Sequence, residues 1–195
     1  MGDFKVKPLD EATWPDFARL VERHNGIWGG CWCMAFHAEG VGRGTTAAQN
    51  RSQKELRVRE GRAHAALVYD GADCVGWCQF GPPDELPRIK HGRAYREGLV
   101  ALPDWRITCF FVDKAYRHER VAFAALSGAL QEIARLGGGT VESYPEAVDG
   151  RTTSGSFLYN ATISIFERLG FERTRRLGKN HWVVTKVVGA TLQGR

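Results

Sequence analysis

The residues with the most chemical content lie near the middle of the chain. Ile107–Val112 is a continuous apolar run, typical of a buried central strand. From Val121 apolar residues recur at spacings of three and four, which predicts a helix that ends at a triple glycine. A helix that begins directly after a central strand points unpaired backbone N–H groups at the strand's carboxyl end, and these groups favour a phosphate or pyrophosphate. Arg117 and Arg120 in the connecting turn add guanidinium groups that match phosphate oxygens.

The elements around this segment predict a mixed α/β layout around one sheet. Amphipathic periodicity indicates helices, and Asp70-Gly71 between two apolar runs indicates a hairpin. The expected elements are helices over 10–23 and 47–60, hairpin strands over 64–69 and 73–80, a long basic connection over 84–104, a strand over 140–144, a short helix capped by Asn160, and closing strands over 171–175 and 181–188.

The composition limits the classes of protein. A length of 195 residues fits a single domain over 1–195, and 43% hydrophobic with 25% charged residues is typical of a globular chain rather than a disordered or collagen-like one. The net charge of +5 suits an anionic small ligand as well as a nucleic acid. Because no apolar window reaches the ~18 residues of a membrane span and the first residues lack a signal-peptide core, we expect a cytoplasmic protein with reduced thiols.

Four short patterns occur in a family-like order. Residues 117–122 read Arg-His-Glu-Arg-Val-Ala, and the approach over 111–117 reads Phe-Val-Asp-Lys-Ala-Tyr-Arg. Residues 165–171 read Ile-Phe-Glu-Arg-Leu-Gly-Phe, and Val-Gly stands at 75–76 in the predicted hairpin. In their order and spacing, over residues 4–188, these patterns resemble the GNAT superfamily of acetyl-CoA-dependent N-acetyltransferases.

The chain departs from the family's motifs at three positions. The signature Gln/Arg-x-x-Gly-x-Gly/Ala is matched at its ends, whereas Arg120 stands at its middle glycine. Lys114 replaces the proline of the Val-x-Pro-x-x-Arg run. Phe166 stands where family members often have a tyrosine that protonates the departing thiolate. A glycine lets the backbone approach phosphates closely, but an arginine side chain can reach them itself, so we expect binding to be retained.

The resemblance implies a fold and a cosubstrate. The fold would be a mixed, mostly antiparallel central sheet flanked by helices, with splayed fourth and fifth strands and the pantetheine arm of acetyl-CoA between them. The N–H of Val112 would polarise the thioester carbonyl. The residues that the resemblance places around acetyl-CoA are Phe110, Phe111, Val112, Arg117, His118, Glu119, Arg120, Val121, Ala122, Asn160 and Phe166.

The implied reaction is acetyl transfer to a primary amine by direct attack on the thioester. The amine must first lose a proton, because an alkylammonium has a pKa of about 10. Asp113, Glu142 and Tyr144 are candidate bases; Glu142, which shares a strand face with Tyr144, is the first choice. Tyr159 is the candidate acid, although a CoA thiolate can also leave unassisted.

The loop Cys31-Trp32-Cys33, followed by His37, has metal-ligand residue types. Its single Cys-x-Cys and one histidine do not match the paired spacing of structural zinc sites, so we expect no metal. We expect this loop to border the acceptor entrance instead. Its candidate substrate-lining residues are Trp28, Trp32 and Phe36.

The acceptor is the least determined part of the prediction. A small-molecule amine is favoured, with no membrane partner and a possible homodimer. The basic connection over 84–104 and the basic cluster over 173–179 are interpreted as solvated or facing an acidic substrate, because Tyr95 alone is interleaved with their basic residues and a nucleic-acid site needs several such aromatic residues. Two alternatives stay open: a non-catalytic acyl-CoA-binding regulatory module, and a transferase that acts on a protein or on aminoacyl-tRNA.

Overall fold

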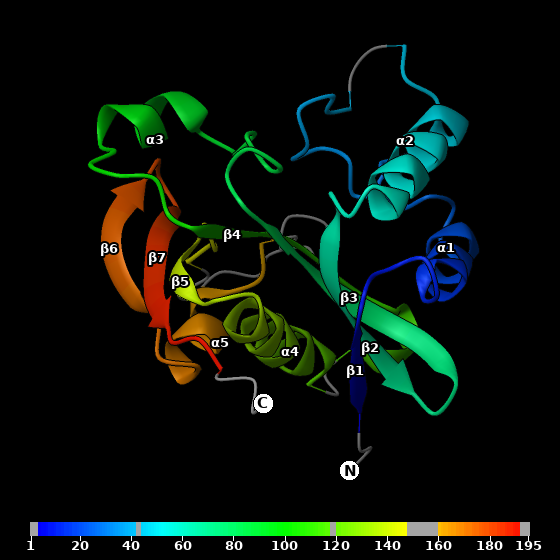
Figure 1. Ribbon diagram of the computed structural model, residues 1–195. Helices are drawn as coiled ribbons and strands as arrows, with labels where there is room; N and C mark the ends of the chain where they lie inside the picture. The colour runs from blue at the N-terminus through cyan, green and yellow to red at the C-terminus, as the bar shows by residue number, and fades with distance from the viewer. Residues whose placement is uncertain (1–3, 42–43, 118–119, 148–159, 192–195) are drawn as a thin grey trace.

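The computed structural model of the chain describes residues 4–41, 44–117, 120–147 and 160–191. One seven-stranded sheet has the order β1-β2-β3-β4-β5-β7-β6, and helices cover both of its faces (Figure 1). Within the described residues, no helix has the length and apolar character needed to cross a membrane. The elements are β1 (Lys5–Pro8), α1 (Trp14–Arg23), α2 (Ala47–Arg59), β2 (His64–Asp70), β3 (Asp73–Gly81), α3 (Gly92–Glu97), β4 (Trp105–Val112), a 3-10 turn (Lys114–Tyr116), α4 (Val121–Arg135), β5 (Gly139–Ser143), α5 (Ile163–Arg168), β6 (Glu172–Leu177) and β7 (His181–Val188).

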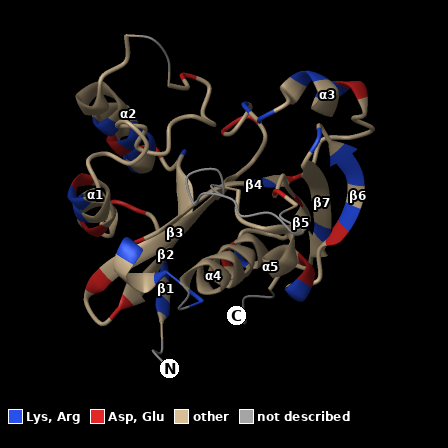
Figure 2. Ribbon diagram, turned by 180° about the vertical axis from the view of Figure 1, so that it is seen from behind, with Lys and Arg blue, Asp and Glu red and all other residues tan. Residues whose placement is uncertain are grey.

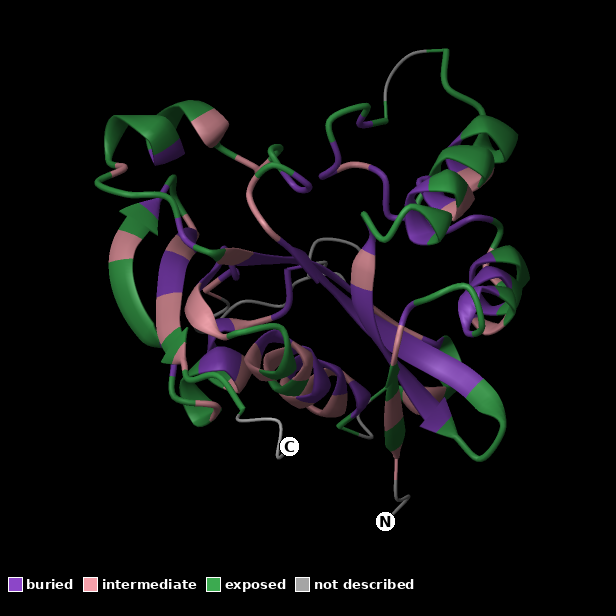
Figure 3. Ribbon diagram, in the orientation of Figure 1, coloured by how far each residue is buried: buried purple, intermediate pink, exposed green. Residues whose placement is uncertain are grey.

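The two largest hydrophobic clusters of the described residues lie on opposite faces of the sheet. On one face Phe17 of α1 packs against Trp77 of β3 with ring centroids 4.8 Å apart. On the other face the apolar stripe of α4, which includes Leu126, packs against the sheet together with Phe110. Gly128 lets α4 approach β1, since a Cβ there would lie 2.3 Å from Val6 Cγ1. Burial on both faces explains why β2, β3 and β4 are almost wholly apolar runs (Figure 3).

The centre of the sheet is open along part of β4. On one side β4 pairs antiparallel with β3 along most of its length, up to the pair Gly76–Val112. On the other side it pairs in parallel with β5 only from Trp105–Val141 to Ile107–Ser143. The remaining β4 residues, 108–112, have no strand partner on that side in the described chain. The expected mixed sheet with splayed fourth and fifth strands is therefore confirmed.

Several local expectations need correction. Asn160 does not cap α5: Thr162 is the N-cap, and Asn160 Nδ2 instead donates to the carbonyl of Tyr144 at 3.2 Å. The basic connection over 84–104 contains the short helix α3. The strand expected over 171–175 is β6, Glu172–Leu177.

Candidate active site

The open edge of β4 presents unpaired main-chain groups. The N–H of Asp113 donates to the carbonyl of Val75 in β3 at 2.8 Å. In an antiparallel pair the hydrogen-bonding groups of successive residues alternate between the two sides of the strand. The N–H and C=O groups of Phe110 and Val112 therefore point away from β3, toward the side where β5 no longer pairs.

The N-terminus of α4 lies at the end of this edge. Gly76, which pairs with Val112, has so little space that a Cβ there would lie 2.7 Å from Val121 Cγ1. The first-turn N–H groups of a helix have no partner within it. The first turn of α4 holds no acidic residue, and its N-cap Arg120 makes no side-chain capping bond. This helix end therefore suits an anion.

The backbone of Arg120 has the conformation for which glycine is selected. Its φ is +64°, in the left-handed region, although a side chain there costs about 1 kcal/mol or more. The turn thus has a backbone conformation that a glycine at position 120 would adopt without this cost. Arg117 is exposed beside it, while His118 and Glu119 lie outside the described residues.

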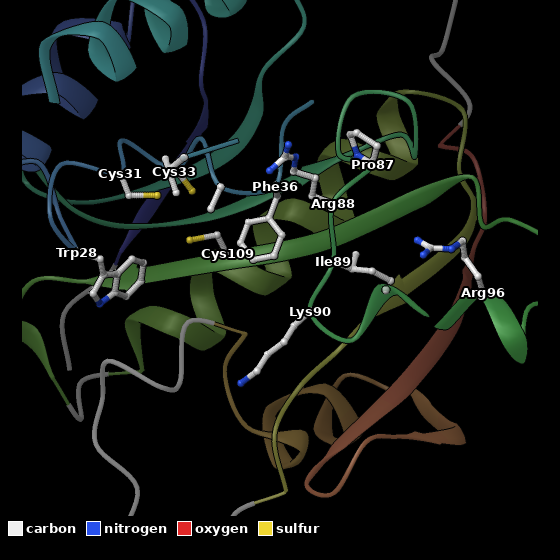
Figure 4. Close-up of a pocket in the computed structure, with 13 residues that line it drawn as sticks. Trp28, Cys31, Cys33, Phe36, Pro87, Arg88, Ile89, Lys90, Arg96 and Cys109 are labelled. Atoms are coloured by element: carbon white, nitrogen blue, oxygen red, sulfur yellow. The ribbon is translucent and has the colours of Figure 1, made fainter. Parts of the chain in front are cut away.

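A cavity of about 710 Å³ lies against the opposite face of the sheet from α4. Cys109 of β4 forms part of its wall and directly precedes Phe110, so the cavity adjoins the open edge (Figure 4). The lining residues are Trp28, Cys31, Cys33, Ala35, Phe36, Val41, Pro87, Arg88, Ile89, Lys90, Gly92, Arg96 and Cys109.

Two of the three expected substrate-lining aromatic residues do line this cavity. Trp28 and Phe36 are in its wall. Trp32 is not, because its ring turns into the core, where it is 3% exposed and packs 6.0 Å from Trp14 and 6.5 Å from Phe17. The sequence gives no sign of which aromatic residues in this glycine-rich loop point inward.

The loop that forms this wall is strained. Non-glycine residues in the left-handed region cost of order 1–3 kcal/mol each where the surroundings impose it. Their φ values here run from +38° to +58°. The residues are Asn25, Ile27, Trp28, Trp32 and Cys33. Such strain persists only where packing holds it, and it is concentrated at functional sites.

A buried polar network that includes Lys54 supports the cavity wall from behind. Lys54 of α2 is 1% exposed; its Nζ donates to Gln79 Oε1 at 2.8 Å and lies 3.1 Å from His37 Nε2. Burial lowers the pKa of Lys54. Burial opposes ionisation of Cys33, but a hydrogen bond with the Cys109 thiol and the Lys54 charge lower its pKa. Sequence reasoning missed Lys54, because it lies in a helix expected to be exposed.

The three candidate bases lie in two settings: Glu142 and Tyr144 share one buried hydrogen-bonded cluster, and Asp113 lies apart from them. Glu142 is buried and accepts hydrogen bonds from the hydroxyls of Tyr95 at 2.7 Å and Tyr144 at 3.2 Å; it is not in the cavity wall. Burial holds the pKa of the Tyr144 hydroxyl well above its usual range. Asp113 forms an ion pair with Arg23 Nη2 at 2.8 Å. Burial alone would raise the pKa of Asp113, but the hydrogen bond from the Ala115 N–H and the contact with His24 lower it below its usual value.

Of the two positions considered for the acid, the structure describes only Phe166. Tyr159 lies outside the described residues. Phe166 is fully buried and packs edge-on against Phe110, with ring centroids 5.9 Å apart. Its contribution is therefore to hold β4 in place, since a phenyl ring has no proton to give.

No family model and no curated protein matches this chain, but solved structures do. A protein from Desulfovibrio desulfuricans assigned to the GNAT family of acetyltransferases is 15% identical over 95% of this chain and 99% of that one, with a TM-score of 0.54. The assigned acetyltransferase yncA of Salmonella typhimurium, solved with its cofactor acetyl-CoA, is 13% identical over 97% and 96%, with a TM-score of 0.53. A mosquito arylalkylamine N-acetyltransferase-like protein is 12% identical over 95% and 100%, with a TM-score of 0.55. The chain therefore has the GNAT acetyltransferase fold.

Proposed function

We propose that this protein is an N-acetyltransferase that moves an acetyl group from acetyl-CoA to a small primary amine by direct attack on the thioester. The observation that carries the proposal is the open edge of β4 at Phe110 and Val112. It lies between an uncapped helix end and a cavity. The GNAT fold, and a structural neighbour solved with acetyl-CoA, support it.

The open edge suits an extended ligand that carries amides. A pantetheine arm can add to β4 as a short strand would, through the main-chain groups of Phe110 and Val112. A backbone N–H on this edge would also polarise the thioester carbonyl, and it would need no reorganisation because the sheet fixes it beforehand. Side-chain identity matters little for this task, which is consistent with the low sequence identity to the neighbours.

The diphosphate of the donor would bind at the start of α4. Its unpaired first-turn N–H groups and the helix dipole favour negative charge. The exposed Arg117 and the N-cap Arg120 add guanidinium groups on the same turn. The guanidinium of Arg120 would thereby compensate for the closer contact between backbone and phosphate that a glycine would allow.

The acceptor amine would bind in the cavity on the other face, next to Cys109. Holding amine and thioester together contributes up to about 7–11 kcal/mol in favourable cases. Because Phe166 cannot donate a proton, the CoA thiolate would leave as the anion. A thiol pKa of about 8.5 makes that departure easy near neutral pH.

The test is amine-dependent release of CoA. The full chain is incubated with acetyl-CoA and a panel of primary amines, and free thiol and acetylated product are both measured. We expect thiol release to rise with amine concentration and to match the product in amount. Calorimetry that finds no acetyl-CoA binding at millimolar concentration would contradict the proposal.

A second candidate is a non-catalytic acyl-CoA-binding module. It is favoured by Phe166, which leaves no acid at the tyrosine position, and by the strained Arg120 in the phosphate turn. It predicts tight acetyl-CoA binding with no acetylation of any amine.

A further inference from the structure

We propose that the acceptor is a small amine that carries both an apolar body and an anionic group, as an aromatic or branched α-amino acid does. This inference rests on the proposed function and names its substrate class. The anionic group would bind to Arg88 and Arg96, and the apolar body would pack on Trp28 and Phe36.

The cavity wall is positively charged. Of the thirteen described residues that line it, three are cationic and none is Asp or Glu. The chain as a whole has 27 basic against 22 acidic residues, so a wall without acids departs from its average surface. The cations of the wall are Arg88, Lys90 and Arg96. All three come from one segment, across the cavity from Trp28 and Cys31 (Figure 4).

Two of these cations, Arg88 and Arg96, lack carboxylate partners in the part of the chain that the structure describes. Nearby arginines are paired: Arg93 lies 2.9 Å from Glu97 and Arg57 lies 2.7 Å from Glu39. Among residues 4–41, 44–117, 120–147 and 160–191, no ion pair includes Arg88 or Arg96. A guanidinium group matches a carboxylate or phosphate in a bidentate way.

Positions of these groups are set by packing. The guanidinium of Arg88 lies against Gly40, where a Cβ would come 2.2 Å from Nη1. Arg96 is on α3, which β6 supports through a bond from Arg175 Nη2 to the carbonyl of Tyr95 at 2.9 Å. Figure 2 shows that β6 also carries basic residues, since three of its six residues are arginine. The positive field at this end of the cavity therefore comes from more than one element.

The remaining wall is apolar. Trp28, Phe36 and Ile89, with Val41 and Pro87, can cover a ring or a branched chain. The volume of about 710 Å³ is that of a small-molecule site. An amine with only an apolar body would leave Arg88 and Arg96 without a carboxylate, and an amine with a second positive charge would be repelled.

The same charges promote the reaction. Nearby positive charge lowers the pKa of an ammonium group and so raises the neutral fraction that can attack the thioester. Among the wall residues that the structure describes, no carboxylate is present to hold the ammonium in its charged form. The three cations of the wall outnumber the single charge of a bound carboxylate, so the positive charge that remains still favours the neutral amine.

Matched amines test the inference. The full chain with acetyl-CoA is supplied with L-phenylalanine, 2-phenylethylamine, 1-amino-2-phenylethylphosphonate or spermidine, and kcat/KM is measured from free thiol. We expect phenylalanine to exceed phenylethylamine by about tenfold or more, the gain of a charge-assisted hydrogen bond, and spermidine to be the poorest. The phosphonate distinguishes two kinds of anion site. A general anion site would accept both phenylalanine and the phosphonate, whereas a site shaped for a carboxylate would accept phenylalanine alone.

Variants assign the effect to the arginines. Arg88→Gln and Arg96→Gln should each lower the phenylalanine-to-phenylethylamine ratio of kcat/KM at least about fivefold, mainly through KM, since one charged contact is lost. Arg93→Gln is the matched control, because that exposed side chain of α3 pairs with Glu97 and lies outside the wall. A ratio near one, or equal effects on both amines, overturns the inference.

Binding separates this inference from the proposed function. Phenylalanine is titrated against the CoA-loaded protein, with tryptophan fluorescence as the readout. Saturable binding that Arg88→Gln weakens supports the anion site even if no acetylation follows. Acetylation of phenylethylamine without any preference for phenylalanine leaves the transferase standing and removes the substrate class. Binding of neither amine to the CoA-loaded protein also overturns the inference.

Discussion

His37 is held neutral by its surroundings. The side chain has no exposed surface; its Nδ1 lies 3.1 Å from the carbonyl of Glu85 and its Nε2 lies 3.1 Å from Lys54 Nζ. Because an ammonium has no lone pair, Nε2 must accept and Nδ1 must carry the proton. Burial, and then the Lys54 charge, lower the pKa of His37 from 6.5 to about 2.

This depressed pKa predicts a loss of stability in mild acid. The unfolded chain binds a proton at His37 near pH 6.5 and the folded chain does not, so the contribution is complete above pH 6.5 and decreases as pH falls toward 2. The free energy of unfolding should fall by up to about 1.4 kcal/mol per pH unit from this group. Denaturant titrations at pH 7 and pH 5 should show a loss about 2 kcal/mol larger in the natural chain than in His37→Asn. Parallel losses in the two chains would contradict it.

Arg120 combines a backbone cost with an electrostatic gain. Arg120→Gly should raise the free energy of unfolding by about 1 kcal/mol, because glycine adopts the left-handed conformation without steric cost. The same change should weaken acetyl-CoA binding several-fold, because one guanidinium is lost from the phosphate turn. Calorimetry and thermal melts measure the two effects separately. Arg120→Asn, which tolerates this φ without the charge, is the control; a less stable glycine variant would show that the side chain is structurally required.

The element that the proposed function depends on most is the start of α4. Ala122→Glu places a negative charge in the first turn, beside the expected diphosphate. We expect acetyl-CoA affinity to fall more than tenfold, while the helix itself is slightly favoured by an acidic residue at this end. Gln131→Glu near the other end of α4 adds the same charge and should change affinity less than twofold, because the dipole effect is confined to the terminal turn. Equal effects of both variants in a binding titration would exclude a phosphate site here.

Elements whose apolar residues recur with a regular period could be predicted from the sequence. Element boundaries that depend on the backbone conformation of one residue could not. The apolar run of β4 and the three-four spacing of α4 predicted both elements. The short helix α3 was missed because it begins after His91, whose left-handed φ of +58° has no sequence signal. The Asn160 cap was wrong because Ala161 takes a φ of +57°, which leaves Thr162 to begin α5.

The candidate site also has parts that the sequence could predict and parts that it could not. Main-chain positions on β4 followed from the strand and from the family resemblance, since they depend on register more than on side chains. The cavity wall depended on loop conformation, so Trp32 was misplaced. Lys54 could not be found at all, because its helix is so polar that no apolar stripe distinguishes the buried face.

At the scale of the whole molecule the sheet is two halves joined by a short β4–β5 pairing, from Trp105–Val141 to Ile107–Ser143. A ligand in the opening above this pairing would bridge β4 to β5. At 100 times its Kd, acetyl-CoA should add about 2.7 kcal/mol to the free energy of unfolding, which raises Tm by roughly 5–10 °C for a chain of this size. Hydrogen exchange should slow in β5 and β7 as well as in β4. S-acetylpantetheine, which lacks the diphosphate, should raise Tm by less than acetyl-CoA does. Protection from hydrogen exchange that is confined to α4 would place the ligand outside the sheet opening.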